Sequence, residues 1–132
     1  MKRHFELPEE DIEYLESSCY KWETITNGRF NWVIIYDFPV PDGYNQHAVD
    51  VALRIDQGYP VSQIDMAYFH PSLQLLNGKV IGASNALQAI EGKNWQRWSR
   101  HRTGHNPWRP GIDDISTHLQ LVAFWIEREL II

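Results

Sequence analysis

The amino-acid sequence predicts an α+β fold in which two helices cover one face of a four-stranded antiparallel sheet. Segments of alternating polarity follow one another between residues 20 and 69, and the loops that join them are too short for parallel crossovers. A short helical pattern precedes these strands and a longer amphipathic pattern closes the chain. Between the last strand and the closing helix, residues 71–112 form a long irregular region. The order of elements therefore predicts a layer of helices on a sheet.

Residues 8–19 predict the first helix. Pro8 suits a first helical turn, and the three acidic residues that follow it favour the positive end of the helix. Cys19 recurs on the same helical face as Ile12 and Leu15, so we expect it to be a small packed side chain.

Four strands are expected next, at residues 20–26, 30–38, 47–55 and 62–69. Asn27-Gly28 is a typical hairpin turn between the first two. The apolar run Val33–Ile35 indicates that the second strand is buried on both faces.

After His70-Pro71 the chain has little periodicity, although residues 84–90 fit one or two helical turns. A long segment without regular structure is usually functional or disordered, and this one is too aromatic for disorder. The chain closes with a helix from Asp113 to Leu130, capped by Asp113 or Asp114.

Length and composition predict one domain that spans residues 1–132. The net charge of -5 argues against non-specific adhesion of the whole molecule to nucleic acid or anionic membranes. A single cysteine excludes an internal disulfide. The N-terminus turns acidic before any apolar run, and no apolar run approaches a membrane span, so we expect a cytoplasmic protein.

The segment Lys93–Pro110 concentrates the chemistry of the chain. It holds three of the six tryptophans, two of the six histidines and five of the twelve basic residues, and no acidic residue. Its arginines can pair with internal carboxylates such as Asp113 and Asp114 or with an acidic partner. Its tryptophans can anchor a partner or pack within the loop itself. A nucleic-acid-binding module that uses this basic, aromatic segment is an alternative function.

The histidines predict neither a metal site nor a cofactor site. His101 and His105 have a helical ligand spacing, but Gly104 and Pro107 argue against a helix there. We therefore expect no metal and no cofactor. His70 is expected to be structural, because the proline that follows it restricts its backbone to extended forms.

Four short motifs occur in an order that resembles the ubiquitin-conjugating (E2, or UBC-like) fold. They are Tyr59-Pro60, His70-Pro71, Asn77-Gly78 and Trp108-Arg109-Pro110. Five longer pieces resemble prokaryotic E2 family E, namely residues 7–11, 37–45, 58–60, 94–101 and 107–114. The resemblance covers nearly the whole chain. It implies a bacterial ubiquitin-like conjugation or processing pathway, with anti-phage defence as its expected setting.

The partners that the resemblance implies are a ubiquitin-like protein, an E1-like adenylating protein and a JAB-type metallopeptidase. The cysteine that accepts the ubiquitin-like C-terminus in E2 enzymes would fall near Ile81 or Gly82, and neither is a nucleophile. Ser72 stands where E2 enzymes usually carry an asparagine that supports the oxyanion. The chain is therefore expected to be either a non-catalytic adaptor or an enzyme with another nucleophile.

The candidate catalytic residues are His101, as an acid or base, and Ser84 and Ser99, as acyl acceptors. The residues expected to bind a partner or line the active-site groove are His70, Trp95, Arg97, Trp98, Arg100 and Trp108.

Overall fold

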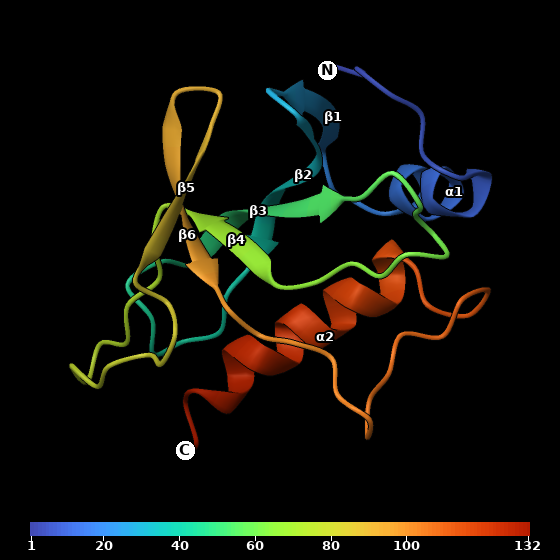
Figure 1. The fold of residues 1–132 in the computed structure, drawn as a ribbon. Coiled ribbons are helices and arrows are strands. Elements are labelled where there is room, and N and C mark those ends of the chain that lie inside the picture. Colours follow the sequence, from blue (N-terminus) through green and yellow to red (C-terminus); the bar gives the residue numbers. More distant parts are fainter.

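A computed structural model describes residues 1–132 and has two helices and one curled antiparallel sheet (Figure 1). The helices are α1 (Glu9–Ser17) and α2 (Ile115–Arg128). The strands are β1 (Trp22–Asn27), β2 (Phe30–Pro39), β3 (Ala48–Ile55), β4 (Ala67–His70), β5 (Ala86–Ile90) and β6 (Lys93–Trp98). Neither helix has the length and apolar character that a membrane crossing requires.

The sheet has six strands in the order β1-β2-β3-β4-β6-β5, so the predicted four-stranded meander is confirmed and extended. Every pairing is antiparallel. The prediction of an irregular region throughout residues 71–112 is wrong, because β5 and β6 form a hairpin within it. The prediction of helical turns at residues 84–90 is also wrong. Glu91 and Gly92 both have positive φ and form the tight turn between Ile90 and Lys93.

The fourth strand is shorter than the expected residues 62–69 and begins at Ala67. Met66 has φ of 58°, a left-handed conformation that extended strands do not contain. The backbone of Met66 instead pairs with other parts of the chain. Its amide donates to Arg100 O at 3.2 Å, and its carbonyl accepts from His118 Nε2 at 2.9 Å.

Both faces of the sheet are apolar. The larger buried cluster lies between the sheet and the helices, and it includes Val33 and Ile35 of β2. The smaller cluster lies on the other face and comprises Ile25, Trp32, Ile34, Ala52, Tyr68, Ile90 and Trp95. The predicted burial of β2 on both faces is therefore confirmed.

The curl of the sheet brings the tips of its two outer hairpins together and covers the second cluster. The amide of Glu91 donates to Asn27 Oδ1 at 2.9 Å, and Lys2 Nζ lies 3.0 Å from Glu91 Oε2. Figure 1 shows the β5–β6 hairpin rising beside the β1–β2 hairpin, with α2 below the sheet and α1 to the right.

A buried carboxylate joins the two helices. Asp11 of α1 is 2% exposed, and its Oδ1 accepts a hydrogen bond of 3.1 Å from the amide of Ile115, the first residue of α2. Its Oδ2 accepts a hydrogen bond of 2.7 Å from Tyr59 Oη. Burial raises the pKa of Asp11, and the bonds from Tyr59 and Ile115 partly oppose that rise. Trp108 packs beside Tyr59 in the same cluster of side chains, and its Nε1 donates to Pro60 O at 2.9 Å.

The end of α1 differs from the sequence prediction, whereas the predicted cap of α2 is confirmed. Cys19 lies beyond α1 and is exposed, so its predicted packing is wrong. The reason is that the helix ends at Ser17 and Ser18 is extended, which turns Cys19 off the apolar face. Asp114, one of the two predicted caps, accepts from the amide of Thr117 and begins α2.

Replacement of Asp11 should destabilise the fold strongly. We expect Asp11→Ala to lower the free energy of unfolding by about 2–4 kcal/mol, because the Tyr59 hydroxyl and the Ile115 amide both lose their acceptor. Tyr59→Phe removes one donor and should lower it by about 1 kcal/mol. Urea unfolding of both single variants and the double variant measures these values and their coupling. The exposed neighbour Glu10 supplies the control, Glu10→Ala. An Asp11→Ala protein as stable as this control would contradict the prediction.

Candidate functional site

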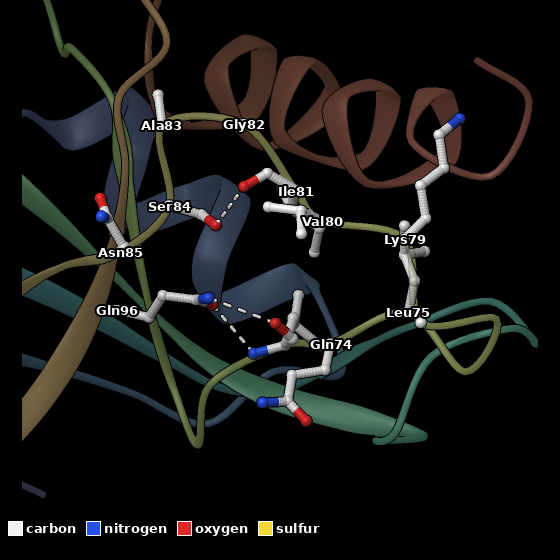
Figure 2. A pocket seen from close by; sticks show the side chains of 12 residues that line it. Gln74, Leu75, Lys79, Val80, Ile81, Gly82, Ala83, Ser84, Asn85 and Gln96 are labelled. Carbon is white, nitrogen blue, oxygen red and sulfur yellow. Dashed lines mark hydrogen bonds between the residues drawn. The ribbon is translucent and has the colours of Figure 1, made fainter.

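A groove with a volume of about 580 Å³ opens between the segment that follows β4 and the segment that leads into β5. Residues 73–75, residues 78–85 and Gln96 line it. Figure 2 shows Gln96 on the floor beside Ser84, and Lys79 extending from the rim. The groove lies in the region where the resemblance places the active site.

Gln96 organises the floor of the groove. It is 7% exposed, and its Oε1 accepts from the amide of Leu73 at 2.9 Å while its Nε2 donates to Leu73 O at 3.2 Å (Figure 2). The same Oε1 accepts from Trp98 Nε1 at 3.0 Å. The side-chain amide thus replaces a neighbouring strand for Leu73. Sequence reasoning missed Gln96 because nothing local marks a glutamine in a strand as buried.

Asn45 holds the same segment from the other side. Its Nδ2 donates to Ser72 O at 3.1 Å, and its Oδ1 accepts from the amide of Gln74 at 2.8 Å. The amide of Asn45 donates to Gln74 O at 2.9 Å. The segment that follows His70-Pro71 is therefore fixed by two side-chain amides, Gln96 and Asn45, that lie far from it in sequence.

The opposite wall has three consecutive carbonyl groups, at residues 81–83, that all accept hydrogen bonds. The carbonyl of residue 81 accepts from Ser84 Oγ at 2.8 Å (Figure 2). The next accepts from Arg100 Nη1 at 2.9 Å, and the third accepts from the amide of Ser99 at 2.9 Å. The backbone amides of residues 80–85 donate no hydrogen bond within the chain. The wall therefore offers donors, and its acceptors are occupied.

Charge is distributed unevenly around this groove. Residues 66–112 contain six Lys and Arg side chains and one acidic side chain, Glu91, a net charge of +5. The other 85 residues contain six basic and sixteen acidic side chains, a net charge of -10, which gives the total of -5. Glu91 itself is paired with Lys2. Three of the six basic side chains, Arg100, Arg102 and Arg109, pair with Glu129 or Asp113 outside this range. The cations left without an acidic partner near the groove are Lys79, Lys93 and Arg97, so the groove has positive surroundings within an acidic protein.

Two of the arginines brace the chain between β6 and α2. Arg100 Nη2 lies 3.6 Å from Glu129 Oε2, and its guanidinium stands 5.0 Å from the ring centre of Trp98. Arg102 is 5% exposed at its side chain and lies 3.7 Å from Asp113 Oδ2. Of the alternatives left open by the sequence, internal pairing is therefore confirmed for Arg102. Arg97 is partly buried and forms no ion pair, and its buried Nε has no hydrogen-bond partner.

The tryptophans are packed inside the protein. Trp98 is fully buried and contacts Phe69, with ring centres 5.1 Å apart. Trp95 is 3% exposed and its ring centre lies 5.5 Å from that of His70. Of the two alternatives that the sequence leaves open for Trp95 and Trp98, the structure shows packing within the protein, because their indoles belong to the two buried clusters. Their burial keeps both rings from stacking on nucleic-acid bases, which removes two of the three tryptophans that supported that alternative.

The remaining predicted residues do not converge on one point. His70 Nδ1 lies 3.3 Å from Asn94 O, which fits a structural role. His101 is exposed and its Nδ1 lies 3.0 Å from Asp65 Oδ2. No hydrogen bond joins His101 to Ser84 or Ser99, and of these three only Ser84 lines the groove.

No group of three or more His, Cys, Asp or Glu side chains comes together in a way that suits a metal ion. His105, the second histidine of the predicted spacing, is exposed on the loop between β6 and α2.

A further buried polar residue that no local pattern in the sequence marks is His118 of α2, which is fully buried. Its Nε2 donates to Met66 O at 2.9 Å, and its Nδ1 accepts from Arg102 Nη2 at 3.2 Å. Burial lowers the pKa of His118 to about 4, and the positive charge of Arg102 acts in the same direction. The neutral ring thus connects α2 with the loop after β6 and with Met66, the residue directly before β4.

Comparison with known proteins gives one family. The model of prokaryotic E2 family E matches residues 7–129. No curated protein and no solved structure matches the chain.

The buried His118 should make the fold sensitive to acid. Its pKa is lower in the folded state than the ordinary value of 6.5, so between pH 6.5 and 4 the unfolded state binds the proton more readily and stability falls as pH falls. We expect a loss of up to about 3 kcal/mol over this window. His118→Gln keeps a donor and an acceptor but cannot take up the proton.

Urea unfolding at several pH values tests this expectation, with His105→Gln, at an exposed position, as the control. Between pH 6.5 and 4, His118→Gln should lose less stability than the wild type, and the difference should be most of the ~3 kcal/mol expected from His118. Asp11, with its raised pKa, contributes in the opposite direction in all three proteins and cancels in the comparison. Parallel pH curves for the wild type and His118→Gln would contradict the assignment.

Gln96 should be essential to the shape of the groove. We expect Gln96→Leu to lower the free energy of unfolding by about 2–4 kcal/mol, because Leu73 and the Trp98 indole lose buried hydrogen bonds. Gln74→Leu changes an exposed side chain on the same wall and should alter stability by less than about 0.5 kcal/mol. Thermal unfolding and the amide NMR spectra of residues 72–75 measure the effect. An unchanged spectrum of these residues in Gln96→Leu would rule out the proposed support.

Proposed function

Because the chain belongs to prokaryotic E2 family E, we propose that it is an E2-like component of a bacterial ubiquitin-like conjugation or processing pathway that binds its partners without forming a thioester. The single observation that carries this proposal is the composition of the groove wall. Residues 78–85 surround a groove at the position implied for the E2 active site, and they contain no thiol.

The two positions nearest to the missing cysteine cannot replace it. The side chain of Ile81 is 6% exposed and belongs to the main apolar cluster, and Gly82 has no side chain. Cys19 is exposed directly after α1. Figure 1 places α1 and the chain between β4 and β5 on opposite sides of the molecule, so Cys19 is remote from the groove.

The groove suits a non-covalent ligand with acceptor groups. The free amides of residues 80–85 can donate to carbonyl or carboxylate oxygens, and the positive surroundings favour a carboxylate. The extended C-terminal tail of a ubiquitin-like protein has these groups. We therefore assign the ubiquitin-like protein to the groove as its first partner, with an E1-like protein and a JAB-type metallopeptidase as further members of the pathway. Anti-phage defence is the proposed setting.

A catalytic form is the second candidate, and the pairing of His101 with Asp65 favours it. The carboxylate holds Nδ1 at 3.0 Å, which leaves Nε2 of an exposed ring available for proton transfer. Ser84 or Ser99 would then accept the acyl group as an ester. The hydroxyl of Ser84 is engaged by Ile81 O, and no base contacts it. For this reason we favour the adaptor.

A purified E1-like protein, a ubiquitin-like protein, ATP and this chain provide the test. The wild type should form a complex with the ubiquitin-like protein but no hydroxylamine-labile adduct. Gly82→Cys should convert non-covalent binding into covalent capture of the ubiquitin-like protein as a thioester. A side chain at this position meets no atom within 4 Å, and Gly82 lines the groove. Cys19→Ser is combined with each variant to remove the natural thiol.

Gly104→Cys is the matched control, since that glycine also has open space around it but lies outside the groove. Capture by Gly82→Cys and not by Gly104→Cys is the expected result. A wild-type adduct that disappears in Ser84→Ala, Ser99→Ala or His101→Gln would overturn the adaptor in favour of the enzyme. Absence of both complex and capture would overturn the assignment of the groove.

A further inference from the structure

We propose that the open edge of β5 binds an extended, acidic segment of a partner protein as a seventh strand of the sheet. The proposal rests on the sheet and its charges, and it does not depend on the function assigned to the groove.

The two edges of the sheet differ in what covers them. At β1, the N-terminal residues form further hydrogen bonds: His4 donates to Thr24 O at 2.9 Å, and Thr24 donates to Lys2 O at 3.1 Å. At the other end of the sheet, β5 pairs with β6 alone. The backbone groups on its outer side are available to another chain.

The hairpin geometry identifies which groups face outward. Glu91 and Gly92 make a two-residue turn, so Ile90 and Lys93 form the first hydrogen-bonded pair and bonded pairs alternate along the hairpin. The backbone groups of Leu87 and Ala89 therefore point away from β6. Gln88 Nε2 donates to Ala89 O at 3.1 Å, so this carbonyl is already occupied. Both outward amides remain free.

Further free amides lie in the segment that leads into β5. The amides of residues 80–85, directly before β5, also donate no hydrogen bond within the chain. Apolar side chains stand along the same stretch, since Leu87 is 60% exposed and Val80 is 86% exposed. A turn at Gly82 and Ala83, where Ala83 has φ of 50°, separates Val80 from β5, so the strand edge itself is made by the outward amides of Leu87 and Ala89. This edge, with the exposed Leu87 beside it, fits an extended chain that places apolar residues at alternate positions.

Charge decides which extended chain fits. Between Met66 and Ile90 there is no acidic residue, and Lys79, Lys93 and Arg97 lie on or beside the β5–β6 hairpin and the groove. A second copy paired edge to edge through β5 would bring these positive surfaces together, which is unfavourable. An acidic segment would meet opposite charge, and its carbonyls would meet the row of donors. The structure therefore favours an acidic partner over self-association.

Hydrogen exchange on the wild-type protein tests the edge directly. The probe is a fluorescein-labelled peptide of about ten alternating Glu and Val residues. In the free protein, the amides of Leu87 and Ala89 should exchange rapidly, while that of Gln88 is protected by β6. At saturating peptide, exchange of Leu87 and Ala89 should slow by at least about tenfold, with little change at Gln88.

Two variants separate the backbone from the side chain. Leu87→Pro removes the outward amide without removing a bond to β6, and it should weaken peptide binding by at least about tenfold. Leu87→Ala keeps the amide and should weaken binding by less than about threefold. A Lys-Val peptide of the same length is the charge control and should not bind measurably.

Three results would overturn the proposal. The first is unchanged exchange at Leu87 and Ala89 with the Glu-Val peptide at about 1 mM. The second is equal binding of the Glu-Val and Lys-Val peptides, which would remove the role of charge. The third is protection of both amides without peptide together with a dimer in sedimentation, which would make a second copy the occupant. None of these measurements uses an E1-like or ubiquitin-like protein, so their failure leaves the test of the groove intact.

Discussion

The arrangement of the molecule depends on one buried carboxylate, Asp11. It accepts from the first amide of α2 and from the hydroxyl of Tyr59, two groups that lie more than 40 residues from it in sequence. These bonds set the start of α2 and hold the Tyr59-Pro60 turn, against which Trp108 packs and donates its indole proton. The family-like pieces near Asp11, Tyr59 and Trp108 therefore meet in one structural cluster. Burial of this carboxylate is tolerated because each oxygen has a donor.

The basic, aromatic segment between Lys93 and Pro110 connects this cluster to the groove. Its first part is β6, whose tryptophans enter the two apolar clusters. Its second part is held by Arg102, which bonds the buried His118 and pairs with Asp113. Arg100 reaches from the same segment to the carbonyl of Gly82. Residues that looked suited to a ligand thus position the wall of the groove. In the function proposed above, backbone donors and the surrounding charge bind the partner.

The apolar pattern of the sequence predicted the elements whose side chains alternate regularly between a buried and an exposed face. Both helices and β1 to β3 follow from alternating or helical apolar patterns, and the Asn27-Gly28 turn has a sequence typical of hairpins. β5 was missed because ALQAI has one β-branched residue and favours helix by composition, and because Glu91 is unusual in a left-handed turn. Gln96 and His118 were missed for another reason. Their partners, Leu73 and Met66, lie 23 and 52 residues away, so only the fold shows their burial. The same holds for the tryptophans, whose side of the sheet no local pattern determines.

The groove and the open edge of β5 are consequences of one feature of the chain. From residue 80 to residue 89 the backbone donors are largely unused, while the carbonyls of residues 81–83 and of Ala89 accept bonds from the protein itself. A surface with donors but few acceptors selects ligands rich in carbonyl and carboxylate oxygens, and the unpaired cations Lys79, Lys93 and Arg97 strengthen that selection. An E2 enzyme that holds its partner through a thioester needs only modest affinity from its groove. A family member without the thiol must obtain its affinity from non-covalent contacts. In the adaptor role proposed above, the free amides of residues 80–85 supply such contacts in the groove.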